Sequence, residues 1–409
     1  MHAVDIVAVA PSEQTQSTFD LFLVFVGANI VATTFQVGAS LASSFPIGAA
    51  TAIIGVGSVA GAALVAVLAP LGPRLRVPSV IASRAALGIR GAGLVAVVLY
   101  VSNFAWIALN NVIAASACAR VSGGSPAAWA VMLGLVATLV VWRGPTAVAR
   151  ADRIAVPLMT VVAIALTVAC LRVEPAAMTS SAPPLGLSRA FDVVVGYQVS
   201  WILMFADYSR YTKSARGSGV AVFLALALTS AWMMPLGTMA ARAAGTTDPG
   251  AMLAAVGLGA SGALLLTLAT VTTNFVNIYM SSLAWKSLMP RTGDTAIVWS
   301  IGIVGAILSA APGAWLDYYT NFMVILGAIL VPVGGVLTAH FYLVRAPVDD
   351  ALVPQLYDRN GAFRGFSIAG MVAWAAGAIV FFASSSIGGT IPALAVSMLT
   401  YVVARRVRS

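Results

Sequence analysis

An indole and two carboxamides fall at helical spacing in the segment VSNFAWIALNN, residues 101–111. Asn110 follows Trp106 by four residues and Asn103 precedes it by three, so the three side chains lie on one side of a helix. An indole face beside paired donors and acceptors suits a flat heteroaromatic ring with amide-like edges. Tryptophan is also enriched at membrane interfaces, but Trp106 lies about a dozen residues inside its apolar stretch, which favours a binding role.

A second candidate site lies in LATVTTNFVNIYMSSLAW, residues 268–285, where Ala269, Thr272 and Thr273 follow an i, i+3, i+4 pattern. This pattern puts two hydroxyls and a backbone carbonyl on one helix face. Together with carbonyls from a broken helix, such neutral oxygen atoms form a shell for a small hard cation. Threonine hydroxyls in membrane helices also commonly bond the carbonyl four residues earlier, so the residues alone leave both roles open.

Carboxylates and histidines are nearly absent from the long apolar stretches. All 13 acidic residues lie in loops or near the ends of those stretches, and His340 is the one such candidate at depth. It is either a proton relay or a neutral imidazole bonded to a neighbouring helix. An enzyme would need a nucleophile, base or metal cluster inside, and a channel would more often show repeated pore-lining rings. We expect neither, and we expect no cofactor beyond a coupling ion.

The composition requires that lipid surrounds the elements that carry these residues. Hydrophobic residues make up 60% of the chain and charged residues 9%, with a mean hydropathy of +0.97, whereas soluble domains carry about 25% charged residues. Apolar runs such as 218–241 and 321–344 are too long for barrel strands, so the chain is expected to be an all-α integral membrane protein. Its net charge of +9 is scattered between apolar runs, which argues against a nucleic-acid partner.

Apolar stretches long enough to span a membrane, about 17 to 25 residues, recur along the chain. They predict about twelve transmembrane helices, near 21–43, 47–71, 93–118, 127–142, 154–171, 191–209, 218–241, 261–285, 295–312, 318–344, 366–385 and 389–404. The first of them has neither the basic flank nor the cleavage site of a signal peptide, so we expect the N-terminus to be retained.

The basic residues divide unevenly between the two sides that this arrangement defines. With a cytoplasmic N-terminus, 18 of the 22 lysines and arginines fall on the inside and only Arg120, Arg172, Arg189 and Arg242 fall outside. One missed or invented helix would invert every later loop and spoil this asymmetry. We therefore predict a multi-pass protein of the bacterial-type cytoplasmic (inner) membrane, with both termini in the cytoplasm.

Two of the predicted helices carry helix-weakening residues in their middle. The first has Gly27, Gln36 and Gly38, and the sixth has Gly196, Gln198 and Ser200. Within a membrane such interruptions are tolerated where the backbone is buried in protein or lines a cavity. The two helices lie five apart, the spacing expected if each opens one of two inverted five-helix repeats. Glycine also serves close helix packing, so no single glycine decides this.

Four segments match one known family. SRAALGIRGAG at 83–93 is similar to its loop between the second and third helices, and FADYSRYTKSAR at 205–216 is similar to the signature that closes its sixth helix. TTNFVNIY at 272–279 and VPVGGVLTAHFYL at 331–343 are similar to its eighth and tenth helices. The chain thus resembles the nucleobase:cation symporter family of cytosine, purine, hydantoin and allantoin permeases.

The resemblance implies a LeuT-type five-plus-five inverted repeat with two additional C-terminal helices. The chain would divide into a cytoplasmic N-terminal tail (1–20), a ten-helix transport core (21–345), a cytoplasmic loop (346–365), two further helices (366–404) and a cytoplasmic tail (405–409). It also implies a sodium site formed by the carbonyls of Ala32, Phe35 and Ala269 and the hydroxyls of Thr272 and Thr273. Within the sixth-helix signature, Asp207 and Arg210 are expected to form a local ion pair or a helix-end tether rather than a substrate contact.

The substrate that the resemblance implies is a flat nitrogen heterocycle, imported by symport with a cation, which the resemblance implies is sodium. The implied substrate site consists of Gln36, Asn103, Trp106, Asn110, Gln198, Ser200, Asn274 and Asn277. Gln198 stands where some members have an aromatic ring, so Tyr197 or Trp201 is a candidate second stacking partner. His340 stands where an acidic residue is usual, which keeps proton coupling open. A permease for a vitamin precursor such as hydroxymethylpyrimidine is the alternative, and no obligate protein partner is evident.

The charge asymmetry makes the predicted topology directly testable. Reporter fusions after Gly124 and after Gly217 should report opposite sides of the membrane, because an odd number of predicted helices separates them. Fusions with an alkaline phosphatase and with a fluorescent protein at each point provide reciprocal readouts. Reports from the same side would mean that the helix count is wrong.

Overall fold

The computed structural model describes residues 6–176, 178, 184–344 and 348–407. These residues form helices joined by turns and loops, with one isolated β-bridge between Gln16 and Thr212. Arg345 and Arg408, which entered the count of basic residues, lie outside the described residues, as do positions 1–5 of the predicted tail.

Each of the twelve predicted stretches overlaps helical structure. In chain order the corresponding elements are α1 (Thr18–Asn29) with α2 (Ala32–Leu41), α3 (Ile47–Ala66), α6 (Arg84–Ser122), α7 (Pro126–Trp142), α8 (Pro145–Cys170), α9 (Leu187–Val199) with the 3₁₀ turn η2 (Ser200–Met204), α10 (Ala215–Ala244), α12 (Gly259–Leu288), α13 (Asp294–Leu308), α15 (Tyr319–Thr338), α17 (Ile368–Ala383) and α18 (Thr390–Arg406). The short helices between them are α4 (Leu71–Leu75), α5 (Ser79–Ala82), α11 (Pro249–Ala255), α14 (Pro312–Asp317) and α16 (Leu352–Tyr357).

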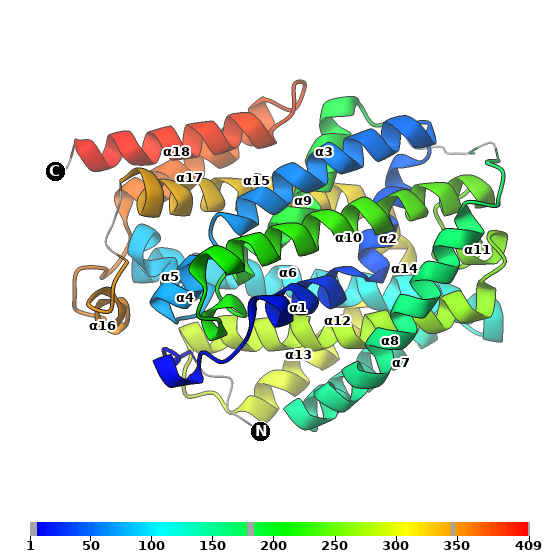
Figure 1. Cartoon of the computed structure of the whole chain (residues 1–409), viewed down its shortest axis with the longest axis horizontal. Coiled ribbons are helices and arrows are strands. Elements are labelled where there is room, and N and C mark those ends of the chain that lie inside the picture. Colours follow the sequence, from blue (N-terminus) through cyan, green and yellow to red (C-terminus); the bar gives the residue numbers. More distant parts are fainter. Residues whose placement is uncertain (1–5, 177, 179–183, 345–347, 408–409) are drawn as a thin grey trace.

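Most of the long helices run side by side along the longest axis of the molecule (Figure 1). Within the described residues, six helices are long and apolar enough to cross a membrane, or seven if the bent pair α1 and α2 forms one span. The helices α7, α13 and α17 are apolar but shorter. The fold is therefore that of a multi-pass α-helical membrane protein, while the number twelve stays a prediction from hydropathy.

The first predicted helix is broken between α1 and α2, which meet at a bend of 57°. The break lies at Ile30 and Val31, between the two glycines that the sequence suggested, and Val31 has an extended backbone with φ of −135° and ψ of 165°. Side chains replace the lost helical bonds: the Thr34 hydroxyl donates to the carbonyl of Asn29 at 2.6 Å. Asn29 Nδ2 in turn donates to the hydroxyls of Thr229, at 2.7 Å, and Ser230, at 2.8 Å. The break is thus stabilised inside the protein, as the absence of water in hydrocarbon requires.

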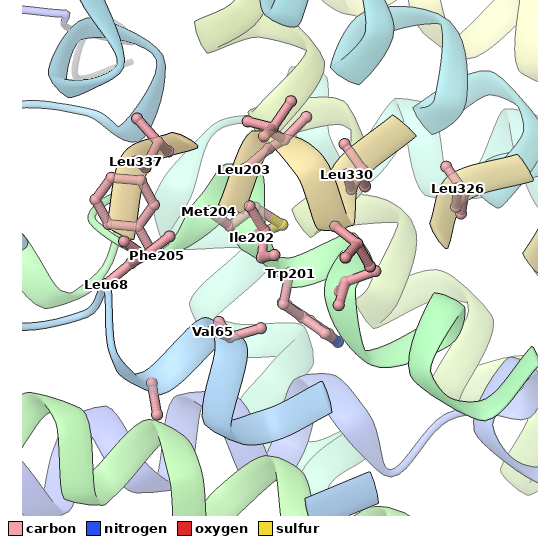
Figure 2. Packing of buried hydrophobic residues seen from close by; sticks show 14 of the residues in the cluster. Val65, Leu68, Trp201, Ile202, Leu203, Met204, Phe205, Leu326, Leu330 and Leu337 are labelled. Atoms are coloured by element: carbon pink, nitrogen blue, oxygen red, sulfur yellow. The ribbon is translucent and has the colours of Figure 1, made fainter. Parts of the chain in front are cut away.

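The sixth predicted helix changes form at its middle. Helix α9 ends at Val199 and the chain continues as the 3₁₀ turn η2, where the Ser200 hydroxyl donates to the Tyr197 carbonyl at 2.7 Å. The apolar side chains after Ser200 spread between α3 and α15, as Figure 2 shows for Trp201, Ile202, Leu203, Met204 and Phe205 beside Val65, Leu68, Leu326, Leu330 and Leu337. This packing holds the irregular segment in one position.

Helix pairing follows a reciprocal pattern. Helix α2 packs on α10 and α9 packs on α3, while α3 and α10 also pack on each other. In the same way α7 contacts α12, α13 contacts α6, and the pairs α6 with α12 and α7 with α13 lie in contact. Exchanging each helix for the one five positions later reproduces these contacts, as expected of two related five-helix units. Helices α17 and α18 pack on each other and on α15, outside this arrangement (Figure 1).

Two glycines allow the backbones of α2 and α10 to touch. A Cβ atom added at Gly38 would lie 1.6 Å from the Met234 carbonyl oxygen, and one added at Gly237 would lie 1.8 Å from the Phe35 carbonyl oxygen. Backbone cannot move aside as a flexible side chain can. The glycine of the first helix thus serves close packing, in the way small residues do in membrane bundles.

We expect Gly38→Ala to destabilise the protein, because overpacking against backbone costs about 1–3 kcal/mol. The melting temperature of the purified protein in detergent should fall by several degrees. Gly55→Ala is the matched control, since an added Cβ there meets no atom within 4 Å, and alanine is the better helix former. Equal melting temperatures for the two variants would contradict the close contact.

Candidate functional site

A cavity lies where the α1/α2 break meets α6, α9, η2, α12 and α15. It leaves about 40 Å³ in which the centre of a water molecule can lie, room for roughly three waters. Five of the eight predicted substrate residues line it, namely Asn103, Trp106, Asn110, Ser200 and Asn277. The cavity is thus narrow in this conformation, and its walls combine apolar rings with neutral polar groups.

Aromatic rings form one wall of the cavity. The Trp106 indole is 8% exposed and lies edge to face against two rings, Tyr197 at 5.7 Å and Phe322 at 5.2 Å between centroids. Tyr197 and Trp201, the two candidates for a second stacking partner, both line the cavity. Phe322 had no sequence signal, because it lies on α15, outside the matched segments. These contacts fix the indole plane, so a ring entering the cavity meets a rigid apolar surface.

Two asparagines in the cavity wall have hydrogen-bonding atoms without a partner. Asn110 Nδ2 donates to the Trp106 carbonyl at 2.9 Å, and since a carbonyl only accepts, the Asn110 oxygen faces the other way. That oxygen and the Asn103 amide nitrogen are buried and have no hydrogen-bond partner among the described residues. A buried unpaired polar atom costs about 1–3 kcal/mol. The cavity therefore favours a ligand whose edge carries donors and acceptors.

Three predicted substrate residues lie outside the cavity lining. Gln36 Nε2 donates to the Thr247 carbonyl at 3.1 Å, in the loop after α10. Gln198 Nε2 donates to the Leu226 carbonyl at 3.3 Å, facing α10. Asn274 bonds to another asparagine, Asn111, instead. All three are buried, and their contact with substrate stays a prediction from the resemblance.

Four of the five predicted cation residues line cavities at this break, and one of them, Thr273, lines the larger cavity. A second cavity of about 10 Å³, the size of one water, is lined by Ala32, Phe35 and Ala269 together with Ile30 and Val31. The hydroxyls that complete the predicted set both donate to the Ala269 carbonyl, Thr272 at 3.1 Å and Thr273 at 2.6 Å. In this conformation they therefore make the local helical bonds that the sequence left open as their alternative role. Ala32 and Phe35 lie within α2, where helical bonds also engage the carbonyls.

The charged signature that ends the sixth helix lies away from both cavities. Asp207 is buried and accepts hydrogen bonds from the backbone N–H of Ser79, at 3.4 Å, and from its hydroxyl. Arg210 lies over the Tyr211 ring, with its Cζ 5.0 Å from the centroid, and donates to the Tyr211 hydroxyl at 3.0 Å. Asp207 thus ties this end of the helix to α5, which agrees with the tether that we expected.

The histidine at depth bonds to a C-terminal helix. His340 lies in a π-helical turn, Ala339–Leu343, that continues α15, and its Nδ1 is 2.7 Å from the Tyr401 hydroxyl of α18. It does not line either cavity described above. The geometry matches the structural alternative, an imidazole bonded to a neighbouring helix.

Comparison with known proteins gives one family. The family profile described as permease for cytosine/purines, uracil, thiamine, allantoin matches residues 8–404. Cytosine permease of Escherichia coli (strain K12) is 24% identical over 279 residues, which cover 64% of this chain and 63% of that relative, so less than two thirds of its length is matched. The putative purine-cytosine permease YxlA of Bacillus subtilis (strain 168) is 24% identical over 367 residues, 84% of this chain and 79% of the relative.

Solved structures share the fold. Mhp1, a nucleobase-cation-symport-1 family transporter in a closed conformation with bromovinylhydantoin bound, is 18% identical and superposes with a TM-score of 0.82 over 98% of this chain and 94% of its own. A Na⁺-coupled sialic acid symporter is 14% identical, with a TM-score of 0.63 over 98% of this chain and 90% of its own. These proteins are transporters, and the all-helical fold described above is theirs.

Proposed function

The chain belongs to the family of permeases for cytosine and purines, uracil, thiamine and allantoin, and from this premise we propose that it is a symporter for a flat nitrogen heterocycle. It imports the heterocycle across the bacterial inner membrane together with sodium, by alternating access of one helix bundle against the other. Both termini lie in the cytoplasm. Its relatives are permeases rather than enzymes.

The observation that carries this proposal is the pairing of the Trp106 indole with unpaired amide atoms in one cavity. The indole offers a stacking face, and stacking of a base on an aromatic ring contributes about 1–3 kcal/mol with little regard to which base it is. Affinity therefore comes from the ring face. Discrimination between substrates comes from the ring edge, since a ligand that leaves Asn103 or Asn110 unpaired loses about 1–3 kcal/mol of binding free energy for each group.

Sodium coupling rests on the chemistry of the groups beside the α1/α2 break. The oxygens there are neutral carbonyls and hydroxyls, which suit a hard monovalent cation that does not need a carboxylate. Thr272 and Thr273 turn from the Ala269 carbonyl when a cation is coordinated, because their lone pairs and that carbonyl must then face the ion. Val31 lines both cavities, so filling one changes the packing of the other. His340 serves as a contact to α18 rather than as the proton relay.

The substrate assignment predicts two different effects of substitution. Trp106→Phe should weaken all accepted ligands by similar factors, about three- to tenfold, because it reduces a stacking surface that all rings share. Asn110→Ala should change the rank order of the ligands, because it removes an acceptor that only some edges can use. Competition binding with cytosine, uracil, adenine, hypoxanthine, hydantoin and hydroxymethylpyrimidine measures both effects.

Unchanged binding of the whole panel in Trp106→Ala would place the substrate site elsewhere. Preference for hydroxymethylpyrimidine over every base would identify a vitamin-precursor permease of the same family. Gln36→Ala is a useful comparison, because that residue lies outside the cavity lining in this conformation.

The coupling assignment predicts a selective loss of sodium dependence. Thr272→Ala and Thr273→Ala should each raise the sodium concentration for half-maximal uptake roughly tenfold, because a lost oxygen ligand is not replaced in a dry site. His340→Ala should leave this concentration largely unchanged. Uptake into vesicles under imposed sodium or proton gradients measures the effect. Uptake that ignores sodium, follows the proton gradient and disappears in His340→Ala would assign proton coupling instead.

A further inference from the structure

A chain of buried amides leads from the cavity into the packed interior. Asn277, in the cavity wall, donates through Nδ2 to Asn274 Oδ1 at 3.4 Å, and Asn274 Nδ2 donates to Asn111 Oδ1 at 2.8 Å. Asn111 Nδ2 then donates to the Ser309 hydroxyl at 2.9 Å. The Ser309 hydroxyl donates to the Gly305 carbonyl at 2.7 Å, where the chain ends.

These links cross three helices at depth. Asn274 and Asn277 belong to α12, Asn111 to α6, and Ser309 caps the end of α13. Asn111, Asn274 and Ser309 are fully buried, and Asn277 is 8% exposed. With no bulk water nearby, an amide that turned over would place like atoms together and lose its bonds on both sides.

The Ser309 end of this hydrogen-bonded chain fixes the orientation of every amide in it. The Gly305 carbonyl only accepts, so the Ser309 hydroxyl gives its proton there and offers Asn111 a lone pair. Asn111 must then present its nitrogen to Ser309 and its oxygen to Asn274. By the same reasoning Asn274 presents its nitrogen to Asn111 and its oxygen to Asn277, and Asn277 donates through its nitrogen to Asn274. The Asn277 oxygen is left for the cavity.

We propose that Ser309 and Asn111, which do not line the cavity, set the hydrogen-bonding polarity of its wall. Acting through Asn274, these positioning residues make Asn277 present an acceptor. The Asn110 oxygen, oriented by the Trp106 carbonyl, is a second acceptor. Because the Asn103 amide nitrogen is an unpaired donor in the same wall, the site selects heterocycles whose edge directs N–H donors at both oxygens and an acceptor at Asn103. This inference rests on the proposed function and specifies the substrate class for the same cavity.

A glycine on a fourth helix leaves space for the Asn111 amide of this hydrogen-bonded chain. A Cβ atom added at Gly134 of α7 would lie 2.7 Å from Asn111 Nδ2, the atom that donates to Ser309. An alanine there would push the amide from its place without touching the cavity. The polarity of the wall can therefore be disturbed from two independent positions, Gly134 and Ser309.

The test uses ring pairs of nearly equal shape and opposite edge polarity. Uracil and cytosine form one pair and hypoxanthine and adenine the other, since each exchanges a ring N–H for a bare nitrogen and the neighbouring carbonyl for an amino group. Dissociation constants are measured on the purified full chain in sodium buffer. We expect the wild type to bind one member of a pair more tightly than the other. Ser309→Ala and Gly134→Ala should each reduce the ratio of the two dissociation constants about tenfold.

Ser282→Ala is the control. Ser282 is also buried, and its hydroxyl also donates to the carbonyl four residues earlier, that of Ile278, at 2.8 Å. It is not part of the hydrogen-bonded chain of amides. Its ratio should equal that of the wild type. A general structural defect would weaken both members of a pair equally and leave the ratio unchanged. An unchanged ratio in both variants, or a wild-type ratio near one, would overturn the inference. Failure of all four bases, of hydantoin and of hydroxymethylpyrimidine to bind the wild type would instead contradict the proposed function.

Discussion

The need to satisfy polar groups inside the protein, where the surrounding hydrocarbon offers no partner, governs the centre of this structure. The α1/α2 break would expose backbone groups in any other setting. Here Thr34 bonds the carbonyl at the end of α1, Asn29 reaches hydroxyls of α10, and the Tyr319 hydroxyl donates to the Thr33 carbonyl at 2.6 Å. The break is stable because Thr34 of α2 and two neighbouring helices, α10 and α15, supply these partners. Both cavities exist because the chain is irregular at this point.

The walls of the larger cavity differ in how they are held. On one side, the irregular segment after α9 is fixed by apolar packing between α3 and α15 (Figure 2). On the other side, α6 and α12 are joined by hydrogen bonds from buried polar side chains. Asn274 Nδ2 donates to Asn111 Oδ1 at 2.8 Å, and the Thr270 hydroxyl donates to the Asn110 backbone carbonyl at 2.9 Å. Apolar packing is non-directional and permits sliding, whereas hydrogen bonds fix distance and orientation. The two walls of the cavity are thus held by different kinds of contact.

Close backbone contact connects the break to the rest of the molecule. Gly38 and Gly237 bring α2 and α10 together without intervening side chains. Such contacts transmit displacement better than long flexible side chains do. The break, the smaller cavity and the α2/α10 contact thus all involve α2.

The sequence alone determined the features that depend on local periodicity and composition. Hydropathy located the helical stretches, and the i, i+3, i+7 spacing placed Asn103, Trp106 and Asn110 together in the cavity wall, because residues at this spacing share a face in any helix. It also located two interrupted helices, although the first break falls at Ile30 and Val31 rather than at a glycine.

Only the tertiary structure decided which face of each helix meets which neighbour. The resemblance implies that Gln36, Gln198 and Asn274 contact substrate, and in this conformation they bond to a loop, to α10 and to α6, because the rotation of a helix about its axis is set by its packing partners. For the same reason the sequence did not indicate Phe322 or Ser309. Their contacts to Trp106 and Asn111 arise only where separate helices meet. Local pattern fixes what a helix face contains, and long-range packing fixes where that face points.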